Sequence, residues 1–216
     1  LVRLAPNLGW RDVDIPALLA AHPPLAGPVD GVPALVVDNE ANLAALGELW
    51  FGDGASLGDY VHISGEIGVG AGIVVGGQLF RGAHGHAGEL GHTTLEPEGA
   101  ACSCGSRGCL ELFCGQEAIL RRAGLDPAVS TSTGRADGPV STLVEHLGAG
   151  DPRALDALEV AGRSLGTATA SLVKLVDPDT VVLGGIYAVL APWLRASFQR
   201  ALLARPGALL PGSARA

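Results

Sequence analysis

One histidine and three cysteines lie within the 21 residues 91–111, GHTTLEPEGAACSCGSRGCLE. They follow the spacing H-x9-C-x-C-x4-C, which is formed by His92, Cys102, Cys104 and Cys109. Tetrahedral zinc takes four nitrogen or sulfur ligands at about 2.0–2.3 Å, and short glycine-containing loops wrap such ligands around the ion. The spacing therefore predicts a structural Zn²⁺ site whose four positions are all filled by protein.

Other uses of these thiols are less consistent with the sequence. Cys102 and Cys104 are too close along the chain to form an unstrained disulfide, and nothing in the sequence indicates secretion. A nucleophilic cysteine needs a neighbouring base, and three clustered sulfurs would compete for that role. Unliganded buried thiols are the alternative that stays open. Cys114 falls outside the spacing and is predicted to be a small core residue.

Alternating residues predict a strand at residues 60–63, followed by a glycine-rich bend and a hairpin with a turn at Gly76 and Gly77. The hairpin strands are expected at residues 72–75 and 78–80, and Gly68, Gly70 and Gly72 would let the backbone approach a ligand closely. A tight turn that binds nothing is the alternative, because G-x-G-x-G alone is a weak signal.

Helices are predicted on both sides of this segment. Residues 36–52 read as a strand end and then a helix, with Glu40 in the first turn, where an acid is also common for purely structural reasons. Asp151 and Pro152 begin a second helix. Its expected apolar stripe consists of Leu155, Leu158, Leu165, Leu172 and Leu175. Residues 179–185 then read as a buried strand ending in Gly184 and Gly185, and residues 123–139 as a polar loop. This alternation predicts an α/β sheet fold.

Composition limits the function. The formal net charge of −8 makes this chain by itself a poor nucleic-acid binder. A hydrophobic content of 48% is typical of a globular protein. No apolar run approaches the length of a membrane span and no signal peptide pattern is present, so we expect a cytoplasmic protein without membrane partners. Methionine is absent, even at position 1, and we therefore expect the chain to begin inside a longer protein.

Three stretches in the same order, DNEANLAALGE, GVGAGIVVGGQLFRGAHGHAGELGH and CSCGSRGCLE, give the sequence a specific resemblance to the ROK family of repressors and sugar kinases. The resemblance covers essentially the whole chain. It implies an actin/hexokinase-like (ribonuclease H-like) α/β fold with two lobes around a cleft. Residues 1–36 would be the remnant of the small first lobe, and residues 37–216 most of the second.

The resemblance also implies a sugar site. The family's E-x-G-H motif matches residues 89–92, in which Glu89 would bind sugar hydroxyls and His92 would orient the sugar while binding zinc. Glu111 matches a further sugar-contacting acid, and Asn39 a sugar-binding asparagine. Glu40 stands beside Asn39, where family kinases place the aspartate that acts as general base.

Two residues depart from the kinase pattern. Glu40 is one methylene longer than aspartate, and misplacing a base by about 1 Å can cost on the order of 100-fold in rate. Glu66 stands where kinases commonly have a hydroxyl residue near the ATP phosphates, and a carboxylate there would repel triphosphate. The D-x-G-G-T phosphate loop of the family is absent from the chain. That loop would precede Leu1, so the comparison depends on Glu40 and Glu66 alone, and these two residues resemble the regulator branch of the family.

The leading prediction is the sugar-sensing part of a transcriptional regulator. A hexose or amino sugar would be the effector, DNA would be bound by a helix-turn-helix domain absent from this chain, and the protein would form a homodimer or homotetramer. The alternative is a sugar kinase such as a glucokinase, which would use ATP and Mg²⁺. Glu40 would then be its base, and Gly68, Gly70, Gly184 and Gly185 would contact ATP. A third hypothesis is a degenerate zinc-bearing lobe that serves oligomerisation.

Overall fold

The structure is a computed structural model, and it describes residues 2–5, 10–20, 37–66, 68–127 and 138–204. The chain divides into two compact units, Leu1–Asn39 and Glu40–Ala216, and each is described by itself. In the first unit, β1 (Val2–Ala5) pairs antiparallel with β2 (Trp10–Val13), and helix α1 (Ile15–Ala20) follows. The strand expected to end near Val36 lies outside the described residues.

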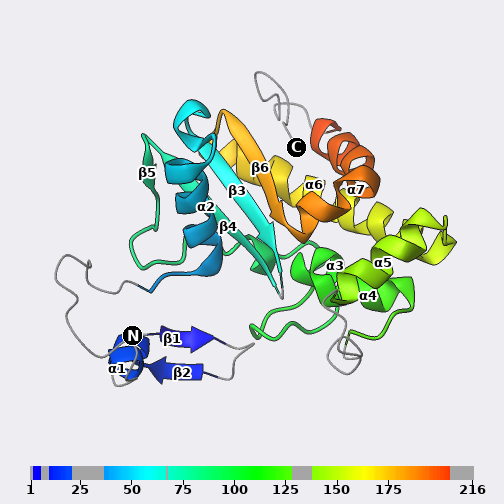
Figure 1. The fold of residues 1–216 in the computed structure, drawn as a ribbon, viewed down its shortest axis with the longest axis horizontal. Helices are drawn as coiled ribbons and strands as arrows, with labels where there is room; N and C mark the ends of the chain where they lie inside the picture. The colour runs from blue at the N-terminus through cyan, green and yellow to red at the C-terminus, as the bar shows by residue number, and fades with distance from the viewer. Residues whose placement is uncertain (1, 6–9, 21–36, 67, 128–137, 205–216) are drawn as a thin grey trace. The chain divides into compact units, whose positions relative to one another are not determined.

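The second unit is built on a four-stranded mixed sheet with the order β5-β4-β3-β6 (Figure 1). Strand β3 (Tyr60–Gly65) pairs antiparallel with β4 (Val69–Val75) and parallel with β6 (Thr180–Gly185). Strand β5 (Gln78–Leu79) completes the predicted hairpin. Its turn residues Gly76 and Gly77 have φ of +60° and +71°, which favours glycine at both positions of a tight hairpin turn.

The glycine-rich bend is shorter than expected, because β4 begins at Val69 and not at Gly72. A Cβ at position 72 would lie 2.5 Å from both the Ala41 carbonyl oxygen and the Ala45 Cβ. Gly72 therefore lets helix α2 (Glu40–Phe51) approach the sheet closely. This packing explains the residue without a ligand.

Helices cover both faces of the sheet (Figure 1). On one face α2 packs against β3 and β4, and the Tyr60 hydroxyl donates a hydrogen bond to the Ala45 carbonyl oxygen at 2.7 Å. On the other face lie α6 (Pro152–Val176) and α7 (Ile186–Leu203), whose buried residues form the main core together with Val61 and Ile63 of β3. Strand β6 is only partly covered, since Val181 alone among its residues is fully buried.

The long helix α6 begins where the sequence predicted. The Asp151 carboxylate accepts a hydrogen bond from the Arg153 N–H at 2.8 Å, and Pro152 takes the first helical position. The predicted leucine stripe is wrong at its two ends, because Leu155 is 41% and Leu175 84% exposed. Both lie in the terminal turns, whereas the buried positions are concentrated in the middle of α6, where α7 packs.

The remaining elements connect the sheet to these helices. They are η3 (Gly54–Ser56), η4 (Leu90–His92), α3 (Glu111–Cys114), α4 (Gln116–Ala123) and α5 (Pro139–Gly148). Residues 128–137 of the expected polar loop lie outside the described residues. Within the described parts of the chain, no helix has both the length and the apolarity to span a membrane.

Replacing Gly166 with alanine should destabilise the second unit by about 1–3 kcal/mol, because the helices α6 and α7 touch there. An added Cβ would overlap the Phe198 carbonyl oxygen and lie 2.9 Å from the Ala201 Cβ. The matched control is Gly47→Ala in α2, where an added Cβ meets nothing within 4 Å. This control should raise stability by about 0.5–1 kcal/mol through helix propensity. Urea unfolding measures both variants, and equal stability of Gly166→Ala and wild type would contradict the close packing.

Candidate functional site

The four predicted metal ligands come from a loop that folds on itself. His92 ends η4, Cys109 directly precedes Leu110 at the start of α3, and isolated bridges pair Thr94 with Cys109 and Ala101 with Arg107. We call residues 92–109 the metal loop. The bridge between Ala101 and Arg107 encloses a tight turn that carries the other two cysteines, and the Cys102 N–H donates a hydrogen bond to the Ser106 carbonyl oxygen at 2.8 Å.

This folding brings one ligand atom each from His92, Cys102, Cys104 and Cys109 within 4.8 Å of one another. The Cys104 and Cys109 sulfurs are 3.7 Å apart, and the Cys102 sulfur is 3.7 Å from His92 Nδ1. Tetrahedral zinc with bonds of about 2.3 Å to sulfur requires ligand atoms roughly 3.8 Å apart, so the side chains already have the spacing of a metal site. Cys114 is outside the group and fully buried, as expected.

The thiols of the cluster differ in how readily they ionise. Burial raises the pKa of the Cys109 thiol to about 12. The hydrogen bond with the Ser106 backbone is the main cause that lowers the pKa of the exposed Cys104 thiol. Thiolate is the form that binds metal, so a bound cation would displace the Cys109 proton and compensate the charge of the buried sulfur.

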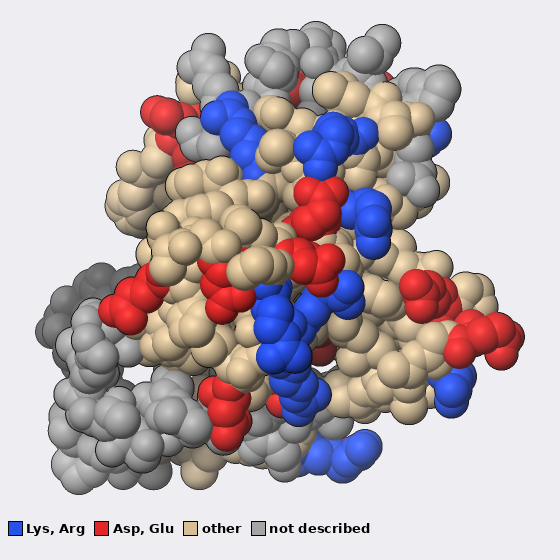
Figure 2. Space-filling view, turned by 90° about the vertical axis from the view of Figure 1, so that its right-hand side faces the viewer, with Lys and Arg blue, Asp and Glu red and all other residues tan. Residues whose placement is uncertain are grey.

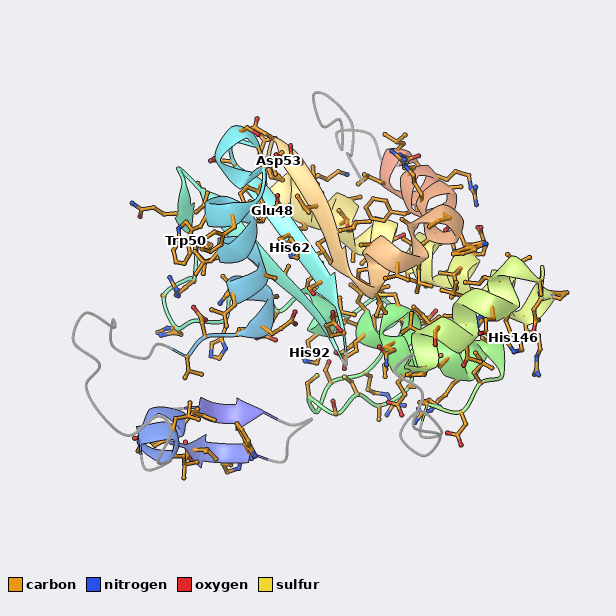
Figure 3. The ribbon with its side chains drawn as sticks, in the orientation of Figure 1. Glu48, Trp50, Asp53, His62, His92 and His146 are labelled. Carbon is orange, nitrogen blue, oxygen red and sulfur yellow. The ribbon has the colours of Figure 1, made fainter. Side chains whose placement is uncertain are left out.

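The candidate sugar contacts Glu89 and Glu111 approach the same strand end. Gly91 packs so closely on β4 that an added Cβ would overlap the Val69 carbonyl oxygen. On the same residue, the Val69 N–H donates a hydrogen bond to Glu111 Oε2 at 3.0 Å. Glu89 is exposed, His92 and Glu111 are half-buried, and Figure 3 shows His92 near this end of the sheet. The E-x-G-H segment and Glu111 are thus both anchored at Val69.

Glu40 lies at the first position of α2, and its carboxylate is already engaged. The Ser64 hydroxyl, buried on β3, donates a hydrogen bond to Glu40 Oε1 at 3.1 Å. Asn39 directly precedes Glu40 in the chain and is the last residue of the first unit.

The candidate ATP glycines lie where the parallel strands β3 and β6 end, which is where open α/β sheets commonly bind ligands. Gly185 has a φ of +57°, and a Cβ there would overlap the Gly65 carbonyl oxygen and lie 2.8 Å from Glu66 Oε1. The Glu66 carboxylate therefore faces Gly185. Gly184 has a packing reason of its own, because a Cβ would lie 2.5 Å from the ring of the buried His62. Figure 3 shows His62 on β3.

Two residues that organise this region were not found from the sequence. Ser64 holds Glu40, as described above. Tyr187, fully buried at the start of α7, donates a hydrogen bond from its hydroxyl to the Cys114 carbonyl oxygen at 2.9 Å, and burial raises its pKa. Its ring occupies the space beside Gly65, where a Cβ would lie 2.6 Å from the ring. The sequence feature that could have pointed to Tyr187 is its position just after the Gly184–Gly185 pair.

Known proteins resemble this chain in sequence and in structure. The ROK family model matches residues 2–206. The xylose repressor of Caldicellulosiruptor bescii is 35% identical over 85% of this chain and 45% of its own length. The glucokinase of Halalkalibacterium halodurans is 36% identical over 84% of this chain and 55% of its own length. This chain therefore spans about half the length of these curated relatives.

A solved structure of a ROK family protein is also similar to this chain. The crystal structure of a ROK family glucokinase from Streptomyces griseus in complex with glucose and AMPPNP matches with a TM-score of 0.74 and 33% identity, covering 94% of this chain and 67% of that one. The sheet, its helices and this likeness define an α/β protein of the actin/hexokinase-like class. The chain belongs to the ROK family.

Proposed function

We propose that this chain is the sugar-sensing part of a ROK-family transcriptional regulator, and that DNA is bound by a helix-turn-helix domain outside it. The observation that carries the proposal is the Glu66 carboxylate, whose Oε1 lies 2.8 Å from the Cβ position of Gly185. Phosphoryl transfer needs groups that stabilise anionic phosphates at such a strand end, and a carboxylate there does the opposite.

Two further observations support a regulator. The Ser64 hydroxyl already occupies one oxygen of Glu40, the residue that would have to act as general base in a kinase. On the face drawn in Figure 2, Lys and Arg side chains are interspersed with Asp and Glu, unlike the continuous basic surface typical of a DNA interface. This mixture agrees with DNA recognition by another domain.

In this proposal Zn²⁺ is structural and is held by His92, Cys102, Cys104 and Cys109. Its contribution is to fix the loop that presents His92 and precedes Glu111, while Glu89 and Glu111 accept hydrogen bonds from sugar hydroxyls. Asn39 would add a further contact. The likeness to a xylose repressor adds a pentose to the hexoses and amino sugars expected from the sequence.

Sugar kinase activity is the second candidate, supported by the likeness to glucokinases at similar identity. Incubating the complete protein with ATP, Mg²⁺ and a sugar panel tests it. Sugar phosphate that forms with wild type and not with Glu40→Gln would establish the kinase and reject the regulator proposal.

Sugar binding should depend on Glu111. Calorimetric titration of the complete protein with xylose, glucose and N-acetylglucosamine should find one sugar that binds wild type and binds Glu111→Gln at least about tenfold more weakly, because hydrogen bonds to a charged group contribute about 1.5–3 kcal/mol. Glu98→Gln is the matched control, since it changes an exposed acid of the metal loop outside the predicted site. Equal affinities in all three proteins would remove Glu111 from the sugar site.

A further inference from the structure

A groove of about 270 Å³ lies along helix α6 beside the metal loop. We call it the α6 groove. It is lined by Glu96 of the metal loop, Phe113 of α3, Arg122 of α4, and Arg163 and Ser164 of α6, together with Leu95, Val160 and Thr167. None of its lining residues is a predicted metal ligand or sugar contact.

Two guanidinium groups and the Glu96 carboxylate are the charged groups that line the α6 groove. Arg122 donates from Nε to Asp156 Oδ2 at 2.7 Å, which satisfies one edge of its fork. Arg163 makes no ion pair within the described residues. An arginine fork matches the geometry of carboxylate and phosphate oxygens, so Arg163 with the remaining donors of Arg122 can bind an oxyanion.

Ser164 adds a hydroxyl group to the wall of the groove. Its side chain lines the groove although the residue is only 9% exposed. Its hydroxyl has no hydrogen-bond partner in the part of the chain that the structure describes. The hydroxyl is free to donate a hydrogen bond, and an oxygen placed in the groove beside Arg163 would accept it.

The other walls indicate what carries the oxyanion. The Glu96 carboxylate can accept hydrogen bonds from ligand hydroxyls, and the Phe113 ring offers an apolar surface for carbon-bound hydrogens. The groove volume of about 270 Å³ lies just below the roughly 300–1,000 Å³ of typical small-molecule sites, so the groove suits nothing larger than a single monosaccharide unit. We propose that the α6 groove binds a small hydroxyl-bearing oxyanion, namely a sugar phosphate or a sugar acid.

Such a ligand would contact the metal loop from outside. The N–H groups of Leu95 and Glu96 donate to the Gly108 carbonyl oxygen at 2.8 and 3.2 Å, and Gly108 directly precedes the metal ligand Cys109. A ligand in the groove would therefore contact the residues whose hydrogen bonds position Gly108 and, next to it, Cys109. The protein would respond to a second metabolite through a site separate from the sugar contacts.

Calorimetric titration of the complete, metal-loaded protein tests the proposal with inorganic phosphate, glucose 6-phosphate and gluconate as probes. Glucose 6-phosphate, gluconate or both should bind wild type and bind Arg163→Gln at least about tenfold more weakly, because an arginine–oxyanion bond is charge-assisted. Ser164→Ala should also bind the same probe more weakly than wild type. Arg121→Gln is the matched control, because Arg121 lies beside Arg122 on α4, pairs with Glu117 and does not line the groove. This variant should bind the probe with the same affinity as wild type.

Three results would overturn the proposal. The first is that no probe binds at about 10 mM, a concentration at which even a millimolar dissociation constant is detected. The second is that inorganic phosphate binds more tightly than both hydroxylated probes. The third is that wild type and Arg163→Gln bind the probes with equal affinity. In the third case, binding that is lost in Glu111→Gln would place the probe at the sugar site. The groove would then be rejected while the proposed function stands.

Discussion

The Cys109→Ser variant should lose its metal ion and, with it, its affinity for sugar. The Cys109 sulfur is completely buried and lies 3.7 Å from that of Cys104, so a replacement at this position cannot be compensated from solvent. A structural zinc site contributes on the order of 10 kcal/mol of apparent binding energy, and a serine hydroxyl is a far weaker ligand than a thiolate. Elemental analysis should fall from about one ion per chain to near zero after dialysis against a chelator.

The matched control for that variant is Cys114→Ala. Cys114 is equally buried and only five residues away, but its sulfur lies outside the group of candidate ligands and beside the Tyr187 hydroxyl. This variant should keep its metal and its sugar affinity while losing about 1–2 kcal/mol of stability to a small cavity. Full metal content in Cys109→Ser, or equal loss of metal in both variants, would reject the cluster as a metal site.

The Gly108→Ala variant should disrupt the metal loop far more than Gly105→Ala. Both glycines have positive φ, +59° and +92°, so an alanine at either position carries a left-handed backbone penalty of about 1–2 kcal/mol. They differ in surroundings: a Cβ at position 105 meets nothing within 4 Å, whereas one at position 108 would overlap the Glu96 carbonyl oxygen. The Glu96 backbone cannot move aside without breaking its hydrogen bonds to the loop.

Thermal unfolding and metal analysis together measure this difference. Gly105→Ala should retain its metal and lower the midpoint by about 2–8 °C, since 1 kcal/mol corresponds to about 2–4 °C in a chain of this size. Gly108→Ala should release metal and unfold at a clearly lower temperature, because the loop has to open before the added Cβ fits. Identical behaviour of the two variants would mean that the loop adapts freely and that its geometry does not hold the ligands.

The features predicted correctly from the sequence are those set by local rules. The clustering of one histidine and three cysteines in the metal loop, the cap of α6 at Asp151 and the hairpin turn at Gly76 all depend on residues close together in the chain. Their physical causes, which are ligand geometry, helix capping and positive φ, act over a few residues. Family resemblance supplied the fold class.

What could not be predicted depends on contacts between distant residues. The Ser64–Glu40 hydrogen bond joins residues 24 positions apart and the Tyr187–Cys114 hydrogen bond joins residues 73 positions apart. No local sequence pattern predicts contacts over such separations. The packing role of Gly72 was not predicted, because the approach of α2 to β4 is not visible in the sequence. Leu175 followed the helical period correctly but lies in the last turn of α6 and is exposed.

The placement of Tyr187 over Gly65 restricts how this protein can change through mutation. Any side chain at position 65 would have to displace the phenol ring, and a smaller residue at position 187 would leave a void beside an unsatisfied Cys114 carbonyl group. Each single substitution is therefore destabilising. A larger side chain at position 65 combined with a smaller one at position 187 would fill the same space. In relatives and in engineered libraries, positions 65 and 187 should vary as a pair.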